Sequence, residues 1–163
     1  MTNKIVHIGC GAGFSGDRVD ASIPVVATLA KRQGPRYLIF ETLAERTLAL
    51  AQKHRRKDPS HGYSPFLEAY IRPILKTCHE SGIGIVSNFG AANPMGGAAK
   101  ITEIARELGC TGLKIAVVEG DDLFQFLSEE EISNYPTIEG LEIGDNEVGA
   151  EARAGGPTLL PQH

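Results

Sequence analysis

Polar residues and glycines that could do chemistry follow four apolar runs of the chain. The first run leads into a turn with four glycines, residues 9–17, and the second ends at Glu41. Asn88 and Asn93 follow the third run, and Asp121 follows the fourth. A carboxylate can move a proton, an amide can hold a carbonyl oxygen, and glycines let the backbone approach a ligand. These residue types favour proton transfer on a small carbonyl compound over hydride transfer.

The glycine turn matches a dinucleotide fingerprint only in part. Residues 11–16 fit G-x-G-x-x-G, and Glu41 lies where an acid could hold a ribose hydroxyl. Pro24, however, predicts that the next helix starts near Ser22, well after the last glycine. A phosphate needs the free N–H groups of a helix N-terminus beside the glycines. We therefore expect a tight turn close to a substrate or to a neighbouring segment, and a nucleotide-binding module stays as an alternative. The candidate binding residues here are Gly11, Gly13, Ser15 and Gly16.

Glu41 and Asn88 are the candidate catalytic residues. Burial of Glu41 at the end of a strand would raise its pKa into the range of a general base. An ion pair with Arg46 is the structural alternative for the same side chain. Asn88 would hold a carbonyl or anionic oxygen beside it.

The third loop also offers an anion site. Asn93 and Gly96 lie at the predicted start of a helix that has no acid in its first turn. A carboxylate or phosphate could approach the backbone N–H groups there, and a well-capped helix is the alternative.

The fourth loop adds acidic groups to the same set. Asp121 is assigned to substrate binding. Together with Glu119 and Asp122 it could instead surround a divalent cation, or simply favour a helix N-terminus. We predict no metal site, and the sequence names no cofactor.

The elements that position these loops follow from the apolar runs. Strands are predicted at residues 4–8, 36–41, 83–89 and 113–119, with helices between them. Because the strands are apolar throughout, we expect a parallel sheet covered on both faces. The predicted fold class is α/β, an open Rossmann-like sheet of four or slightly more strands with helices on both faces. This domain spans residues 1–127, and the acidic, Gly- and Pro-rich residues 128–163 are predicted to be a disordered tail with one weak strand at 141–143.

Composition narrows the class of protein. The 163 residues carry a net charge of −4, which gives no electrostatic reason to expect nucleic acid or an anionic membrane as partner. No apolar stretch is long enough to span a bilayer. Three widely spaced cysteines argue for a reducing compartment, so we expect a cytoplasmic protein.

Five segments of the chain together resemble the acyclic terpene utilisation (AtuA) family. They are IGCGAGFSGDR, YLIFETLAERTLALAQ, DPSHGYSPFLEAYIRPIL, GIGIVSNFGAANPMGGAAKITEIARELG and LKIAVVEGDD, and they cover residues 4 to about 123. The resemblance implies a catabolic setting, beside enzymes that act on acyl-CoA thioesters of branched terpenoids such as citronellol. It assigns no cofactor and no catalytic residue.

The sequence and the resemblance lead to three hypotheses. The first is a protein that binds or acts on a small acyl or acyl-CoA ligand, with lyase- or hydratase-like chemistry if it is an enzyme. Members of the family are several times longer than this chain, so the second is a truncated, non-catalytic fragment or accessory subunit. A homo-oligomer or a partner completing the sheet fits that second hypothesis. The third is the nucleotide-binding module.

Overall fold

A computed structural model describes residues 5–123 and 126–135 of the chain. Most of the predicted tail, with its weak strand, lies outside the described residues. The part of it that is described contains the short helix α6 (Glu129–Ser133), which begins at a capping box. There the Ser128 hydroxyl accepts a hydrogen bond from the backbone N–H of Glu131.

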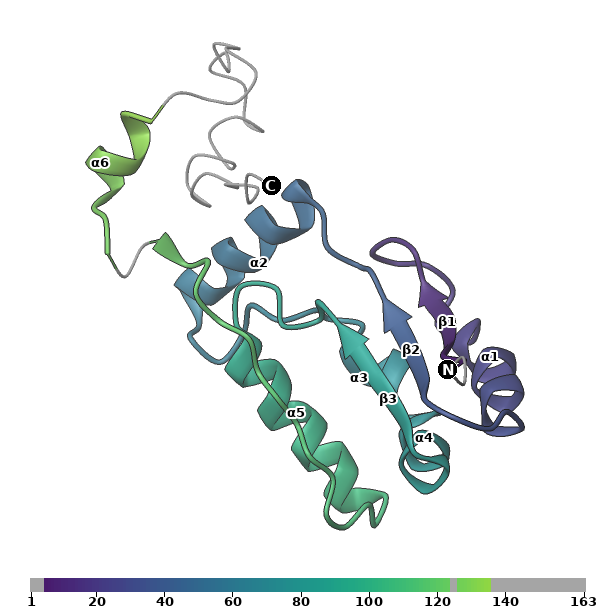
Figure 1. Ribbon diagram of the computed structural model, residues 1–163. Coiled ribbons are helices and arrows are strands. Elements are labelled where there is room, and N and C mark those ends of the chain that lie inside the picture. Colours follow the sequence, from purple (N-terminus) through teal and green to yellow (C-terminus); the bar gives the residue numbers. More distant parts are fainter. Residues whose placement is uncertain (1–4, 124–125, 136–163) are drawn as a thin grey trace.

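Three strands form a parallel sheet in the order β1-β2-β3 (Figure 1). The strands are β1 (His7–Ala12), β2 (Arg36–Phe40) and β3 (Ile83–Ser87). β1 begins later than predicted. It also ends later, because it continues through the first glycines of the turn. Its register with β2 shifts between Cys10 and Ala12. The parallel arrangement that the apolar runs predicted is confirmed for these three strands.

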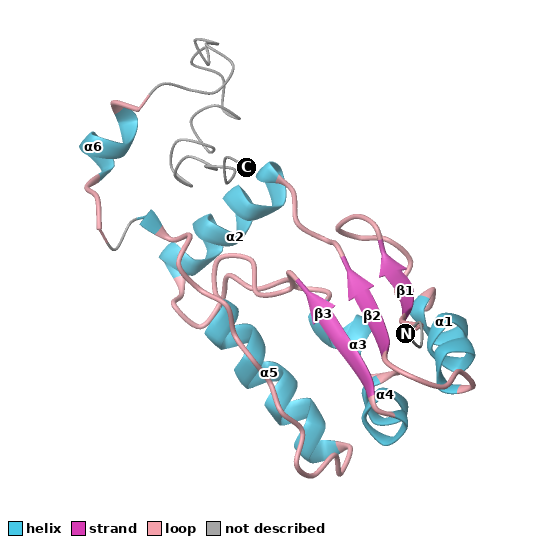
Figure 2. Cartoon of the chain, viewed as in Figure 1, coloured by secondary structure: helices cyan, strands magenta, loops and turns pink. Residues whose placement is uncertain are grey.

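The fourth predicted strand does not join the sheet. Residues 113–119 run as an extended segment alongside α5 and are drawn as loop in Figure 2. None of these residues makes a backbone hydrogen bond within the described part of the chain. The apolar run therefore predicts an extended conformation correctly, but hydrogen bonding to the neighbouring strand depends on a side-by-side approach that local sequence does not specify.

Proline, glycine and asparagine set the helix boundaries. The helices are α1 (Ser22–Ala30), α2 (Glu45–Lys57), α3 (Leu67–Ile71), α4 (Leu75–Ser81) and α5 (Pro94–Glu107). Pro73 lies at a break between α3 and α4, because proline cannot donate the next helical hydrogen bond. Gly82 then ends α4 in the left-handed conformation, with φ of 64°.

The described helices that cover the sheet lie on one face only, which corrects the prediction of helices on both faces (Figure 1). Right-handed crossovers place every connecting helix on the same side when the strand order advances in one direction, as β1-β2-β3 does. Helices reach the second face only where the order reverses, and no such reversal occurs in the described sheet. The result is a layered α/β fold with a one-sided core.

Three aromatic rings lie together in the otherwise mainly aliphatic core beneath this face. Phe40 on β2 contacts Tyr70 and Phe89, with ring centroids 5.6 and 5.0 Å apart, and Tyr70 stacks on Phe89 at 5.5 Å. All three side chains are buried. Because Phe40 ends β2 and Phe89 follows β3, this cluster fixes the strand ends that carry the candidate residues.

Candidate functional site

The carboxyl ends of the three strands bring the glycine turn, Glu41 and Asn88 together. The backbone N–H of Glu41 donates to the carbonyl oxygen of Ala12, the last residue of β1, at 3.0 Å. The Asn88 amide donates to the Glu41 carboxylate at 2.9 Å. Residues that are distant in the sequence therefore meet at one rim, as parallel strands require.

Glu41 is held as a hydrogen-bond acceptor at this rim. Its carboxylate also accepts from the backbone N–H of Leu43 at 3.0 Å. The side chain is exposed, so the burial that the sequence predicted for it is wrong. The ion pair with Arg46, the structural alternative, does not form among the described residues. The partner is the neutral amide of Asn88.

Asn88 is oriented by a residue that the sequence did not single out. Buried Thr42 donates its backbone N–H to the Asn88 side-chain oxygen at 2.8 Å, and its hydroxyl lies 3.3 Å from the same oxygen. These contacts fix the amide so that its NH₂ group faces Glu41. Only the position of Thr42 after Glu41 could have suggested it.

The Asp17 carboxylate accepts hydrogen bonds from the backbone of the glycine turn. The backbone N–H groups of Gly13 and Arg18 both donate to Asp17, at 3.2 and 2.8 Å. The Tyr70 hydroxyl donates to the Asp17 carbonyl oxygen at 2.6 Å, which ties the turn to the aromatic core. The helix that follows begins at Ser22, as predicted, so its N-terminus does not face the glycines.

The candidate glycines and serine of the turn have different surroundings. Gly11 is buried within β1, where an added Cβ would meet the ring of Phe40 at 2.6 Å from Cζ. Gly13 has open space around it, and Gly16 has a φ of 82° that favours glycine. Ser15 is half-buried. Gly11 is thus explained by close packing, while the open positions are Gly13 and its neighbours.

Asn93 caps α5, and the cap uses its whole side chain. Its oxygen accepts from the backbone N–H of Gly96 at 2.9 Å. Its NH₂ group donates to the carbonyl oxygens of Pro59 and His61, at 3.1 and 2.9 Å. The amide therefore joins the α5 N-terminus to the segment after α2, which matches the structural alternative for this position.

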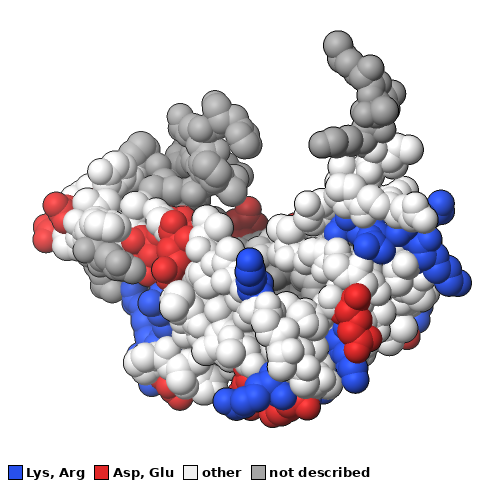
Figure 3. Space-filling view, turned by 60° about the horizontal axis from the view of Figure 1, so that its bottom comes forward, with Lys and Arg blue, Asp and Glu red and all other residues white. Residues whose placement is uncertain are grey.

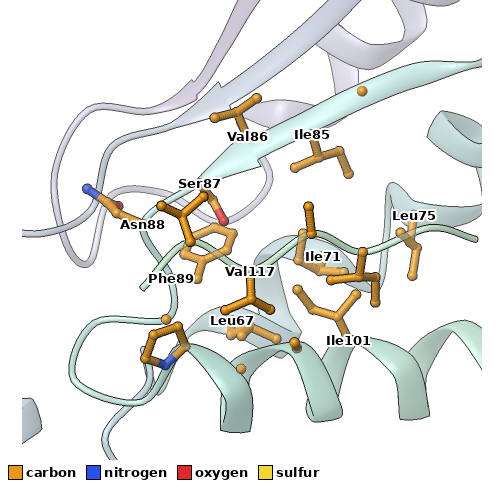
Figure 4. A pocket seen from close by; sticks show the side chains of 18 of the residues that line it. Leu67, Ile71, Leu75, Ile85, Val86, Ser87, Asn88, Phe89, Ile101 and Val117 are labelled. Carbon is orange, nitrogen blue, oxygen red and sulfur yellow. The ribbon is translucent and has the colours of Figure 1, made fainter. Parts of the chain in front are cut away.

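A cleft of about 830 Å³ opens between β3, α5 and the extended residues 113–118. Figure 4 shows four aliphatic side chains pointing into it: Leu67 and Ile71 from α3, Ile101 from α5, and Val117 from the extended segment. These residues belong to segments predicted as helices and strand, and only their assembly in space makes the cleft. Its lining is mainly aliphatic, so it suits an apolar ligand.

Polar groups lie at the strand-end side of this cleft. The hydroxyl of Ser87 points toward it in Figure 4, while the Asn88 side chain points away toward the Glu41 side of the rim. Asp121 also borders the cleft. An apolar interior with a few polar groups at one end can orient a molecule that has a hydrocarbon part and a carbonyl head.

The acidic loop is engaged in an ion pair rather than in a cluster. Asp122 lies 3.1 Å from the guanidinium of Arg55 on α2. Among residues 5–123 and 126–135, no three His, Cys, Asp or Glu side chains are placed to hold a metal ion. Both basic and acidic side chains appear on the face of the molecule that Figure 3 shows.

The backbone between β3 and α5 contains one unusual residue. Ala91 has a φ of 44°, in the left-handed region that favours glycine. Two hydrogen bonds hold this loop: Ala91 N–H donates to the Asn88 carbonyl oxygen at 3.2 Å, and Ala92 N–H donates to that of Gly62 at 2.9 Å. The loop beside Asn88 is therefore fixed in a conformation that costs free energy.

The three cysteines have two kinds of surroundings. Cys78 and Cys110 are buried, whereas Cys10 is exposed on β1. Burial raises the pKa of the Cys78 thiol to about 11, so it stays protonated near neutral pH.

Comparison with known proteins identifies the family of this chain. The model described as "Acyclic terpene utilisation family protein AtuA" matches residues 6–157. The chain belongs to this family. The match extends beyond residue 123, where the recognisable sequence resemblance ends, and includes much of the acidic tail. No curated protein and no solved structure matches the AtuA chain.

Within its described part, no helix has both the length and the apolar character needed to cross a membrane.

Proposed function

We propose that this AtuA protein binds a branched acyl compound, as the free acid or the CoA thioester, in the cleft beside β3. The observation that carries the proposal is the aliphatic lining of the 830 Å³ cleft together with Ser87 and Asp121 at its strand-end side. Its volume lies within the range of roughly 300–1,000 Å³ that is usual for small-molecule sites. Membership of the AtuA family supports a catabolic setting for such a ligand.

In this proposal the hydrocarbon part lies against Ile71, Ile101 and Val117. Branched chains fill such a lining well, because dispersion contacts increase with every methyl group placed against it. The carbonyl end then lies near Ser87, next to the rim where Asn88 holds Glu41. Glu41 and Asn88 lie on the other side of this rim, so a lyase- or hydratase-like step, with Glu41 accepting a proton and Asn88 holding an oxygen, requires the carbonyl end to reach past the end of β3 to their hydrogen bond.

The glycine turn gives little support to the nucleotide alternative. The Asp17 carboxylate already accepts from the N–H groups of Gly13 and Arg18. A phosphate would have to displace this carboxylate and would be repelled by it. We therefore favour the cleft beside β3 over the glycine turn as the ligand-binding site.

The proposal is tested by thermal-shift and calorimetric titration of the full chain. We expect citronellyl-CoA to raise the melting temperature, and NADH to leave it unchanged. Val117→Glu places a charge in the aliphatic lining and should abolish the shift. Ile23→Glu, an equally apolar exposed position on α1, should keep it. Stabilisation by NADH alone, or binding unaffected by Val117→Glu, would overturn the proposal.

A second titration examines the rim. Glu41→Gln should bind citronellyl-CoA with unchanged affinity and melt at nearly the wild-type temperature, because the exposed glutamine can still accept from Asn88. A loss of several degrees in the melting temperature of Glu41→Gln would show that the residue is structural.

A further inference from the structure

The face of the sheet opposite the helices is apolar and exposed. Strand alternation places Ile8 and Cys10 of β1, Tyr37 and Ile39 of β2, and Val86 of β3 on this face. Ile8 is 67% exposed, Tyr37 42%, Ile39 37% and Val86 54%. In Figure 4, the side chain of Val86 points to the opposite side of β3 from that of Ile85. We call these five residues the bare face.

The side chains of the bare face form two rows across the strands. Ile8 pairs with Tyr37, and Tyr37 with Gly84, where the tyrosine ring lies so close that an added Cβ would meet it at 2.8 Å. Cys10, Ile39 and Val86 form the second row. No charged side chain occupies either row, although the chain as a whole carries a net charge of −4.

We propose that the bare face is the interface of a homodimer, in which a second copy of this chain packs its own bare face against it. Parallel sheets occur almost entirely with both faces covered, because an uncovered face leaves apolar side chains in water. A two-fold contact pairs one patch with its own copy, so the patch must be self-complementary, as an uncharged apolar patch is. The bare face meets this requirement.

The area agrees with a dimer of standard size. At roughly 150–200 Å² for a fully exposed large apolar side chain, the bare face with its margin at Val6 offers on the order of 450 Å² of apolar surface per copy. Apolar atoms make up about 65% of homodimer interfaces, so the whole contact is about 700 Å² per copy. Standard interfaces bury roughly 800 Å² per partner. A second copy is therefore sufficient to cover the face.

The proposed interface borders the rim of the site. Glu41 follows Ile39 by two residues, and Asn88 follows Val86 by two, so both continue the outward rows beyond the strand ends. A copy seated on the bare face would form a wall beside the hydrogen bond between Glu41 and Asn88. Dimer formation would thus restrict water at a rim that is exposed in the single chain, and this inference does not depend on what the cleft binds.

Sedimentation velocity of the full chain from 1 to 200 µM tests the proposal. We expect the wild type to be dimeric at the upper end, and Ile39→Lys and Val86→Lys each to weaken the dimer at least tenfold. Ile23→Lys is the matched control, because Ile23 is 45% exposed on α1, away from the bare face. Circular dichroism and melting temperature establish that each variant is folded.

Labelling of Cys10 gives a second readout that does not need a substitution on the face. A maleimide should modify the exposed thiol several times more slowly at 200 µM protein than at 1 µM, and Ile39→Lys should remove this difference. A wild-type monomer at all concentrations, or open-ended aggregation instead of a dimer, would overturn the proposal. So would a dimer that survives both lysine variants, or one that Ile23→Lys breaks equally.

Discussion

Substitution of Gly11 by alanine measures how far the glycine turn is dictated by packing. The new Cβ would lie 2.6 Å from Cζ and 2.9 Å from Cδ1 of Phe40, closer than carbon atoms approach without a shift. Phe40 cannot move away easily, because it is 1% exposed and held between Tyr70 and Phe89. Overpacking of this kind costs about 1–3 kcal/mol of unfolding free energy.

Urea denaturation at fixed protein concentration is the assay. With an m-value of about 1.5 kcal/mol per M, the midpoint of Gly11→Ala should fall by roughly 0.7–2 M. Gly13→Ala is the matched control, because no atom lies within 4 Å of its Cβ position. The control should leave stability unchanged or raise it by up to about 1 kcal/mol through the unfolded chain.

A double-mutant cycle identifies the cause of the loss. In a Phe40→Leu background the ring is gone, so Gly11→Ala should cost much less than it does in the wild type. An equal cost in both backgrounds would refute the packing argument. An equal shift of the urea midpoint in Gly11→Ala and Gly13→Ala would refute it as well.

Three other predictions follow from the hydrogen bonds and the burial. Asn93→Ala should lower the unfolding free energy by about 2 kcal/mol in the same urea assay, since it removes a helix cap and two further hydrogen bonds; a loss below about 0.5 kcal/mol would contradict this. At dilute protein and neutral pH, a thiol reagent should modify Cys10 at once and buried Cys78 only after unfolding, as mass spectrometry can show. Lys100 and a neighbouring arginine hold the pKa of the Glu68 carboxyl below its usual 4.5, so this contribution to stability is complete above about pH 4.5 and is lost as the pH falls through the lowered pKa. Glu68→Gln should therefore flatten that part of a plot of melting temperature against pH, and an unchanged slope would contradict it.

Local signals predicted the starts of α1 and α5 well, although they did not give the bounds of β1. Pro24 places the start of α1 and Asn93 caps α5, as the sequence indicates, and Gly82 ends α4 in the same local way. Each of these residues acts through its own backbone or through partners a few positions away. The parallel strands and the meeting of Glu41 with Asn88 followed from the rule that parallel strands end at one edge.

Features that depend on distant partners were not predictable in this way. The reason for Gly11 is the ring of Phe40, and the orientation of Asn88 depends on Thr42. Strand order decides which face the helices cover, and apolar strands look alike whichever order they adopt. The separation of residues 113–119 from β3 also depends on distant partners, since the sequence of a short apolar run does not specify which strand it pairs with.

The free edge of β3 has a consequence for how the sheet and the cleft are related. A parallel strand can be added beyond β3 only in the space that the cleft now occupies, and residues 113–119 run along its other side. Enlargement of the sheet and occupancy of the cleft by a hydrocarbon chain thus exclude each other. The edge of β3 can therefore either hydrogen-bond to a further strand or border a cleft that holds a ligand.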